Sequence, residues 1–220
     1  MEIPFTDAHT HHLPAKGNIL SCTDLSRSSL SDFPADKIFP VSFGIHPAET
    51  ETGKWESLCE KIRRYPDFAA VGECGMDRNI PIDMEKQKML FLRQCSLAAD
   101  LGKPVIIHCV KAWDILYGCA KRFPAKKRRW LIHSFRGDIA LAKDLLRHNF
   151  TLSLAPQMIL HAPGRAEKFQ SCPFLLETDD SKENITILHQ KMAAYCKMNV
   201  ERLKEKTYHL FHEFFYIPEK

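Results

Sequence analysis

The sequence predicts an α/β fold, a TIM-like (β/α)₈ barrel that is distorted by shortened first crossovers. Short apolar or β-branched runs alternate with helical stretches along the chain, and eight such runs can be counted, which is the order of a parallel barrel. The first two connections leave little room for a crossover helix, which predicts the distortion. Because the sequence contains no internal repeat, low-complexity segment or Gly/Ser linker, we expect one domain over residues 1–220.

The expected strands are short runs rich in Val, Ile, Leu and aromatic residues. They are Ile3–His9, Asn18–Cys22, Val41–His46, Ala69–Glu73, Val105–His108, Trp130–His133, Thr151–Leu154 and Phe174–Glu177. No helix fits between His12 and Asn18. Between Cys22 and Val41 there is space only for a short helix interrupted by Ser and Pro. An open doubly wound sheet is the alternative, but it needs a change of strand order that the sequence does not display.

The expected helices show apolar residues at helical spacing. They are Trp55–Arg64, Asp83–Asp100, Ala112–Arg122, Asp138–His148, Ile185–Cys196 and Val200–Phe214. Gly102 follows the second of these as a stop signal, and Asp138 is the expected N-cap of the fourth.

Composition and charge are those of a globular protein. Hydrophobic residues make up 45% and charged residues 26% of the chain, and the net charge of +4 permits a phosphate-bearing substrate without requiring one. No run of 18 apolar residues is present, and the N-terminal residues lack the pattern of a secretory signal. Eight cysteines without a Cys-x-x-Cys pair are typical of a reduced chain, so we expect a cytoplasmic location.

Metal-binding side chains follow or end five of the expected strands. His9 and His11 stand two residues apart at the end of the first strand, so both imidazoles share one face. The remaining side chains end later apolar runs or directly follow one: Glu73, His108, His133 and Asp179. Because the carboxyl ends of barrel strands meet on one face, we expect all six side chains to converge there.

Four imidazoles and two carboxylates predict a divalent metal centre, and we expect it to hold two ions. This ligand mixture favours Zn²⁺, Mn²⁺, Fe²⁺ or Ni²⁺, whereas a site for Mg²⁺, a further option, would be richer in oxygen ligands. Glu73 is our expected bridging carboxylate. Asp179 can bind a metal weakly and orient or deprotonate a bound water molecule, so we expect Glu73 and Asp179 to be catalytic.

With these residues in place, the sequence resembles the TatD family of metal-dependent hydrolases, within the amidohydrolase-like barrel superfamily. The matching stretches run in order over nearly the whole chain: Asp7–His11, Gly44–Pro47, Gly72–Asp77, Pro104–His108, His133–Gly137 and Leu176–Asp179. The resemblance implies a barrel that binds divalent metals and hydrolyses phosphodiesters, usually as a deoxyribonuclease. It implies that the six side chains named above are metal ligands and that His46 is a site residue near the scissile phosphate.

The sequence departs from the family pattern at the rim of the expected site. Ala48 stands where a second His is frequent, Lys111 where an Arg is frequent, and Asp180-Ser181 where a small residue and Pro are frequent. Family members also tend to be longer, and the missing length falls in the first two crossovers.

Basic residues just after strand ends are the expected substrate contacts. We expect Arg78 and Lys111 first, then Arg136, with Lys182 as a further option. The basic run Lys126–Arg129 precedes a strand, so it belongs to the opposite face of the barrel and is interpreted as a solvated loop.

The sequence therefore predicts a hydrolase acting on ester bonds, a phosphodiesterase or deoxyribonuclease in which a metal-bound hydroxide attacks phosphorus. DNA or another phosphodiester is the expected partner; no membrane and no stable protein partner are expected. Hydrolysis of a small carbonyl substrate, as in amidohydrolases or lactonases, is the alternative, because the same ligands polarise a carbonyl group. A degenerate barrel kept as a binding or scaffold protein is a third reading, against which the complete set of six ligands counts.

Overall fold

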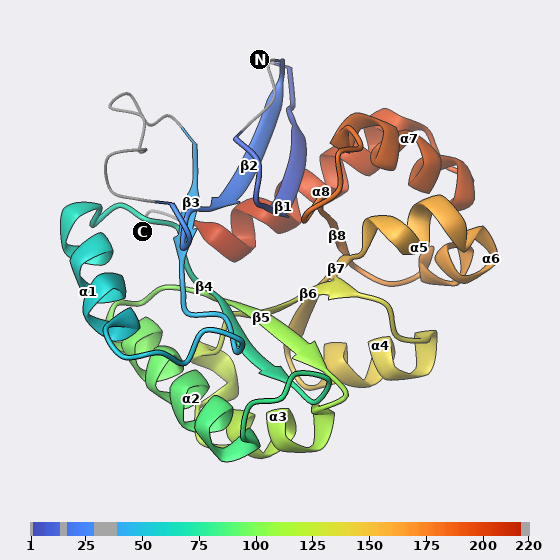
Figure 1. Ribbon diagram of the computed structural model, residues 1–220. Coiled ribbons are helices and arrows are strands. Elements are labelled where there is room, and N and C mark those ends of the chain that lie inside the picture. Colours follow the sequence, from blue (N-terminus) through green and yellow to red (C-terminus); the bar gives the residue numbers. More distant parts are fainter. Residues whose placement is uncertain (1, 14–16, 29–38, 217–220) are drawn as a thin grey trace. The chain divides into compact units, whose positions relative to one another are not determined.

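The computed structural model describes residues 2–13, 17–28 and 39–216 and contains one eight-stranded sheet with its strands in chain order, from β1 to β8 (Figure 1). The strand pairs are parallel, and helices alternate with strands from β3 onward. Beyond β8, the N–H of Asp179 donates to the carbonyl of His9 at 3.0 Å, and the N–H of His11 donates to the carbonyl of Asp179 at 3.2 Å. The last strand segment therefore pairs with the first, which makes the fold a (β/α)₈ barrel.

The chain divides into two compact units, residues 1–23 with 133–220 and residues 24–132. The elements of the first unit are β1 (Phe5–Thr10), β2 (Ile19–Asp24, whose last residue belongs to the second unit), α4 (Ile139–Arg147), β7 (Phe150–Leu154), α5 (Pro156–His161), α6 (Pro163–Ala166), η3 (Glu167–Phe169), β8 (Leu175–Leu176), α7 (Ile185–Tyr195) and α8 (Val200–Phe215). Those of the second unit are β3 (Val41–Phe43), α1 (Lys54–Arg64), β4 (Ala70–Asp77), α2 (Met84–Asp100), β5 (Val105–Val110), α3 (Trp113–Ala120), η2 (Ala125–Lys127) and β6 (Trp130–Phe135), which runs on into the first unit.

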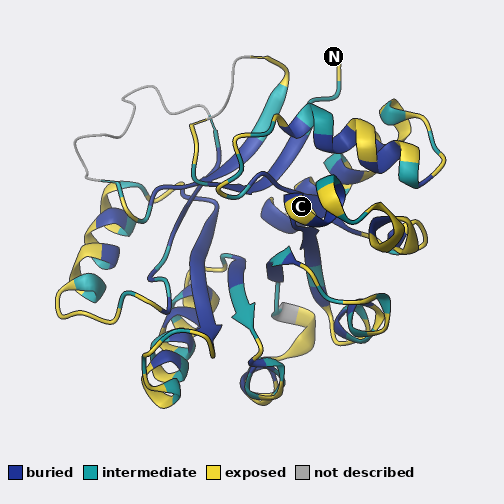
Figure 2. Ribbon diagram, turned by 45° about the vertical axis from the view of Figure 1, so that its right-hand side comes forward, coloured by how far each residue is buried: buried dark blue, intermediate teal, exposed yellow. Residues whose placement is uncertain are grey.

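In the first unit, the helices α4, α7 and α8 begin at side-chain caps. The Asn184 side chain accepts the N–H of Thr186 at 2.9 Å, and the Asn199 side chain accepts the N–H of Glu201 at 2.7 Å, so α7 and α8 each have one terminal donor satisfied. Asp138 caps α4 in the same way, as expected, by accepting the N–H of Leu141 at 2.8 Å. Within each unit the strands are buried, while the helices are buried on one side and exposed on the other (Figure 2).

In the second unit, two buried glutamines of α2 hold the ends of neighbouring strands. Gln94 accepts the N–H of Ile45 at 2.7 Å and donates to its carbonyl at 3.1 Å. Gln87 makes the same pair of bonds with Asp77, at 2.7 and 3.1 Å. The two glutamines are seven residues apart, two turns of one helix face, so a single helix orders the segment after β3 and the end of β4.

The expected strands and helices are confirmed in type and order, with differences at several ends and some added short helices. Strand β2 continues past Cys22 to Asp24. Strands β4, β5 and β6 continue past Glu73, His108 and His133, because the residues that follow keep pairing, as Asp77 does with Val110. Strands β3 and β8 are shorter than expected. The helical segments between β7 and β8 were not expected; their sequence is interrupted by Pro and Gly.

The short helix expected between Cys22 and Val41 falls largely on residues 29–38, outside the described residues. The single domain expected over residues 1–220 stays a prediction. Among helices in the described ranges, none has both the length and the apolar character that a membrane span requires.

Candidate metal centre

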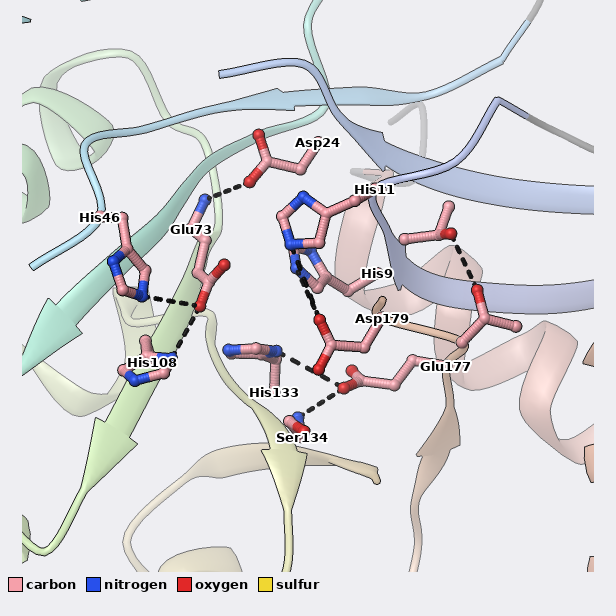
Figure 3. A network of polar contacts seen from close by, with 12 residues as sticks. His9, His11, Asp24, His46, Glu73, His108, His133, Ser134, Glu177 and Asp179 are labelled. Atoms are coloured by element: carbon pink, nitrogen blue, oxygen red, sulfur yellow. Dashed lines mark hydrogen bonds and ion pairs between the residues drawn. The ribbon is translucent and has the colours of Figure 1, made fainter. Parts of the chain in front are cut away.

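In the first unit, three side chains from distant parts of the sequence lie together: His9 of β1, His133 of β6 and Asp179 beyond β8 (Figure 3). One ligand atom from each lies within 4.8 Å of the others. The rings of His9 and His133 meet edge to face with 4.6 Å between centroids, and His9 Nε2 is 4.0 Å from Asp179 Oδ1. His9 and His133 are buried, so these donors form an enclosed set.

His11 joins this set from the rim. Its Nε2 lies 3.6 Å from Asp179 Oδ1, and its ring meets that of His9 at 4.9 Å. The two histidines share a face of the β1 end, as their spacing predicts. Asp179 has a φ of 53°, in the left-handed region that Asp tolerates better than most residues. Asp180, which the sequence placed on the rim, has a carboxylate oxygen within 4.8 Å of ligand atoms of His11 and Asp179.

A buried hydrogen-bond network orders the backbone around Asp179. Thr178 donates its N–H to Asp7 Oδ1 at 3.0 Å, and its hydroxyl lies 2.6 Å from Asp7 Oδ2 and 2.8 Å from the Thr10 hydroxyl. Burial raises the pKa of Asp7 to about 7. The start of β1 and the segment after β8 are thereby joined by side chains as well as by backbone.

Glu177 lies behind His133. Its Oε1 accepts the N–H of Ser134 at 2.6 Å and is 3.5 Å from His133 Nδ1 (Figure 3). Its Oε2 accepts the hydroxyl of Ser153. The side chain is fully buried. The sequence placed Glu177 within a strand and gave it no role in the site. Residues two apart in an extended segment share a face, so the position of Glu177 two residues before Asp179 could have indicated that it lies near the site.

In the second unit, Glu73 of β4 lies between two histidines. Glu73 Oε1 is 2.7 Å from His108 Nδ1 and 3.5 Å from His46 Nε2, and the two rings are 4.6 Å apart between centroids (Figure 3). One ligand atom from each of the three residues lies within 4.8 Å of the others.

His46 is placed to donate a hydrogen bond. Its Nδ1 accepts the N–H of Ala48 at 3.1 Å, so the neutral ring carries its proton on Nε2, toward Glu73. Burial lowers the pKa of His46 below its usual 6.5 and favours this neutral form. A protonated Nε2 has no lone pair for a metal. The site role expected for His46, near the substrate, therefore fits the geometry better than a ligand role.

Two further carboxylates, Asp24 and Asp77, flank this set, and neither has a role among the residues expected from the sequence. Asp24 Oδ2 accepts the backbone N–H of Glu73 at 3.2 Å, while Asp77 Oδ2 lies 3.2 Å from His108 Nε2. A signal for Asp77 was present, since residues four apart in a strand share a face, as Glu73 and Asp77 do.

The three expected substrate contacts differ in how far their side chains are already hydrogen-bonded within the protein. The guanidinium of Arg78 donates to the carbonyl of Lys111 at 2.6 Å and to Asp114 at 2.8 Å, so part of its hydrogen-bonding capacity is used within the protein. Lys111 is exposed and has a φ of 54°. Arg136 is exposed, with one nitrogen 3.5 Å from the hydroxyl of Ser134.

The donor sets of both units fit divalent cations. Each combines imidazole nitrogen with carboxylate oxygen, the mixture that suits zinc and its neighbours among the transition metals. Four of the six expected ligands, His9, His11, His133 and Asp179, lie together in the first unit. The other two, Glu73 and His108, lie together in the second.

Comparison with known sequences gives a family match over most of the chain. The profile of the family described as TatD related DNase matches residues 29–216, beginning after His9 and His11. A relative named 3'-5' ssDNA/RNA exonuclease TatD, from Musicola paradisiaca, is 36% identical over 154 residues, which are 62% of this chain and 54% of that protein. One with the same name from Erwinia tasmaniensis is 33% identical over 97 residues, 43% and 38% of the two chains. The chain spans about half the length of these curated relatives.

A third relative and two solved structures match over a larger share of both chains. An uncharacterized metal-dependent hydrolase of Methanocaldococcus jannaschii is 23% identical over 76% of this chain and 72% of its own. A TatD homolog from Escherichia coli K12 has a TM-score of 0.77 at 19% identity, over 99% of this chain and 100% of that one. A TatD family hydrolase from Entamoeba histolytica has a TM-score of 0.74 at 14% identity, over 98% and 99%. At these identities the structural likeness shows the fold.

Proposed function

Because the chain belongs to the TatD related DNase family, we propose that it is a metal-dependent hydrolase of phosphodiester bonds and that it acts on nucleic acid. The observation that carries the proposal is the presence, in each of its two units, of a compact set of imidazole and carboxylate donors. The names of the Musicola and Erwinia relatives support single-stranded DNA or RNA as the substrate class.

We propose two divalent cations, one in each unit. His9, His133 and Asp179, with His11 beside them, would hold one; Glu73 and His108 would hold the other. Such ions act as Lewis acids toward a phosphoryl oxygen and lower the pKa of a water molecule to about 7. Zinc or manganese fits these donors best. The eight cysteines all lie in the described ranges and none is in a disulfide, which supports the cytoplasm, a reducing compartment, as the location.

The protein side chains would position the substrate and move the proton. The Asp179 carboxylate accepts the proton of the attacking water, since one of its oxygens can bind a cation while the other stays a base. Glu73 binds the cation of the second unit. His46 donates its Nε2–H to a non-bridging phosphate oxygen, because its Nδ1 is already occupied by the N–H of Ala48. Lys111 and Arg136 are the proposed phosphate contacts, and Arg78 orders the segment of Lys111.

A carbonyl substrate is the second candidate, and one observation favours it. A phosphodiesterase needs cations on its rim, and Arg78 is already engaged by Asp114 and the Lys111 carbonyl. A neutral amide or lactone would not need that guanidinium. The two candidates therefore differ in the charge of the substrate that is cleaved.

The experiment measures hydrolysis of end-labelled single-stranded DNA, bis-p-nitrophenyl phosphate and a neutral lactone, each with added Mn²⁺ or Zn²⁺. We expect cleavage of both phosphodiesters, and we expect Asp179→Asn to lower the rate by about 10²–10⁴-fold, the usual loss for a general base. Asp144→Asn, a change of the same kind on the exposed face of α4, is the matched control. Equal rates for wild type and Asp179→Asn would contradict the mechanism, and cleavage of the lactone alone would contradict the substrate class.

A further inference from the structure

We infer that Asp77 is a positioning residue: it holds His108 with the ring proton on Nε2 and so keeps the Nδ1 lone pair for a divalent cation. The inference rests on the proposed function, because it assigns His108 to that cation. It adds a residue to the centre that acts only through another side chain.

The imidazole of His108 lies between two carboxylates. Its Nδ1 is 2.7 Å from Glu73 Oε1, and its Nε2 is 3.2 Å from Asp77 Oδ2. A neutral imidazole has one N–H, and an ionised carboxylate can only accept. One ring nitrogen therefore carries the proton, and the other directs a lone pair at a carboxylate oxygen. Two such facing lone pairs are stabilised by a cation that lies between them.

The surroundings of Asp77 favour the tautomer of His108 with its proton on Nε2. Its Oδ1 accepts the N–H of Asn79 at 2.7 Å, and Gln87 binds both its backbone N–H and its carbonyl. With the backbone held on both sides, the remaining oxygen stays directed at His108 Nε2.

The other ring nitrogen of His108, Nδ1, faces the proposed cation. Glu73 Oε1 also faces His46, and ligand atoms of Glu73, His46 and His108 lie within 4.8 Å of one another. Because His46 presents a proton rather than a lone pair, Glu73 Oε1 and His108 Nδ1 are the two donors on this side of the ring.

The sequence of β4 produces this arrangement. Glu73 and Asp77 lie on one face of the strand, and Gly75 lies between them. A Cβ at Gly75 would stand 1.9 Å from the carbonyl oxygen of His108, so only glycine allows β4 and β5 to approach this closely. The pattern Glu-x-Gly-x-Asp thus brings a carboxylate to each edge of a single imidazole on the next strand.

Asp77→Asn tests the inference because it keeps the shape of the side chain and reverses the hydrogen bond. The amide oxygen would still accept the N–H of Asn79, so the NH₂ group would face His108 Nε2 as a donor. That donor favours the tautomer with its proton on Nδ1, which removes the lone pair meant for the cation.

The first measurement is zinc binding by titration calorimetry on the metal-free full chain, with the thermal midpoint of the same samples as a check on folding. We expect Asp77→Asn to weaken one zinc site by about 10–100-fold, the usual loss when the carboxylate behind a metal-bound histidine is replaced. Asp114→Asn, the same change at an exposed carboxylate of this unit, should bind zinc as the wild type does. Zinc affinity of Asp77→Asn within twofold of wild type would overturn the inference.

The second measurement needs no folded variant of Asp77. In ¹⁵N-histidine spectra of the zinc-loaded wild type, the ring signal that disappears in His108→Gln should come from a protonated Nε2. A proton on Nδ1 instead would overturn the inference, even where Asp77→Asn fails to fold.

The two proposals fail separately. Phosphodiester hydrolysis by the wild type with normal zinc binding by Asp77→Asn would remove the role of Asp77 alone. Zinc binding that depends on Asp77 in a chain that cleaves no phosphodiester would remove the proposed reaction and support the inference.

Discussion

Two buried carboxylates, Asp77 and Glu177, each lie beside a histidine of the candidate metal centre. Glu177 is the more enclosed, because its two oxygens accept the N–H of Ser134 and the hydroxyl of Ser153. Its distance of 3.5 Å from His133 Nδ1 is longer than a hydrogen bond. We therefore interpret Glu177 as a residue that stabilises the strand ends around His133. Its effect on the metal centre is indirect and passes through those strand ends.

The first prediction follows from these donors. Glu177→Ala leaves the N–H of Ser134 and the hydroxyl of Ser153 without this acceptor, so we expect the free energy of unfolding to fall by about 2–4 kcal/mol. Glu177→Gln keeps an oxygen for Ser134 and should lose less than half of that. Urea denaturation followed by circular dichroism measures both. The exposed Glu213→Ala serves as control, and equal losses for the Ala and Gln variants at 177 would contradict the hydrogen-bond assignment.

The second prediction concerns His189, a buried histidine of α7 outside the metal centre. Its Nδ1 donates to the carbonyl of Ile185 at 3.0 Å, and its Nε2 is 3.2 Å from the Thr207 hydroxyl. Burial, with a smaller contribution from the charge of nearby Lys204, lowers the pKa of His189 from 6.5 to about 4. Between these two values the unfolded chain binds a proton that the folded chain does not, so stability is lost as the pH falls.

We expect His189 to cost the wild type about 2 kcal/mol of stability between pH 7.5 and pH 5, at about 1.4 kcal/mol for each unit below 6.5. His189→Gln cannot take up this proton, so its unfolding free energy should depend less steeply on pH by that amount. Urea titrations at both pH values compare the two proteins. Parallel pH dependence of the two would show that His189 is already charged in the folded state.

At the scale of elements, the close approach of β4 to β5 depends on Gly75. Its φ of 149° is unfavourable for other residues, and a Cβ there would stand 1.9 Å from the carbonyl oxygen of His108. Backbone atoms on both strands would have to move. Because His108 pairs directly with Gly75 in the sheet, that movement would displace His108 from both Glu73 and Asp77.

We predict that Gly75→Ala lowers the free energy of unfolding by more than about 3 kcal/mol, the range of severe backbone clashes, or prevents folding. Gly118→Ala is the matched control, because Gly118 lies in α3 with nothing within 4 Å of its added Cβ. There we expect a gain of about 0.5–1 kcal/mol from helix propensity. Thermal or urea unfolding measures both, and similar stability of the two variants would contradict the close approach.

The order of elements could be predicted because hydrophobic periodicity is local, whereas the ends of elements depend on neighbours. Strand β4 continues to Asp77 because β5 runs beside it and Gln87 of α2 satisfies its backbone, neither of which is visible in the strand's own residues. The six ligand types were visible as polar residues in or beside apolar runs. Asp24 and Asp77 were not assigned, because their roles lie in contacts with Glu73 and His108 across strands.

At the scale of the molecule, each unit carries its own donor set, so metal binding can be separated by mutation. We expect dialysis against zinc followed by metal analysis to find two ions in the wild type, one in His133→Gln, which alters the first unit, and one in His108→Gln, which alters the second. Zinc at 100 times its dissociation constant should stabilise a site by about 2.7 kcal/mol, and chelation should remove that gain.

The thermal midpoint gives an independent check of this whole-molecule prediction. For a chain of this length about 2.7 kcal/mol corresponds to a shift of about 5–10 °C, since 1 kcal/mol moves the midpoint by about 2–4 °C. Each single variant should retain part of the zinc-induced shift, because the donor set of the other unit is intact. A variant that loses both ions at once would show that neither set binds alone, and one that loses none would exclude its histidine as a ligand.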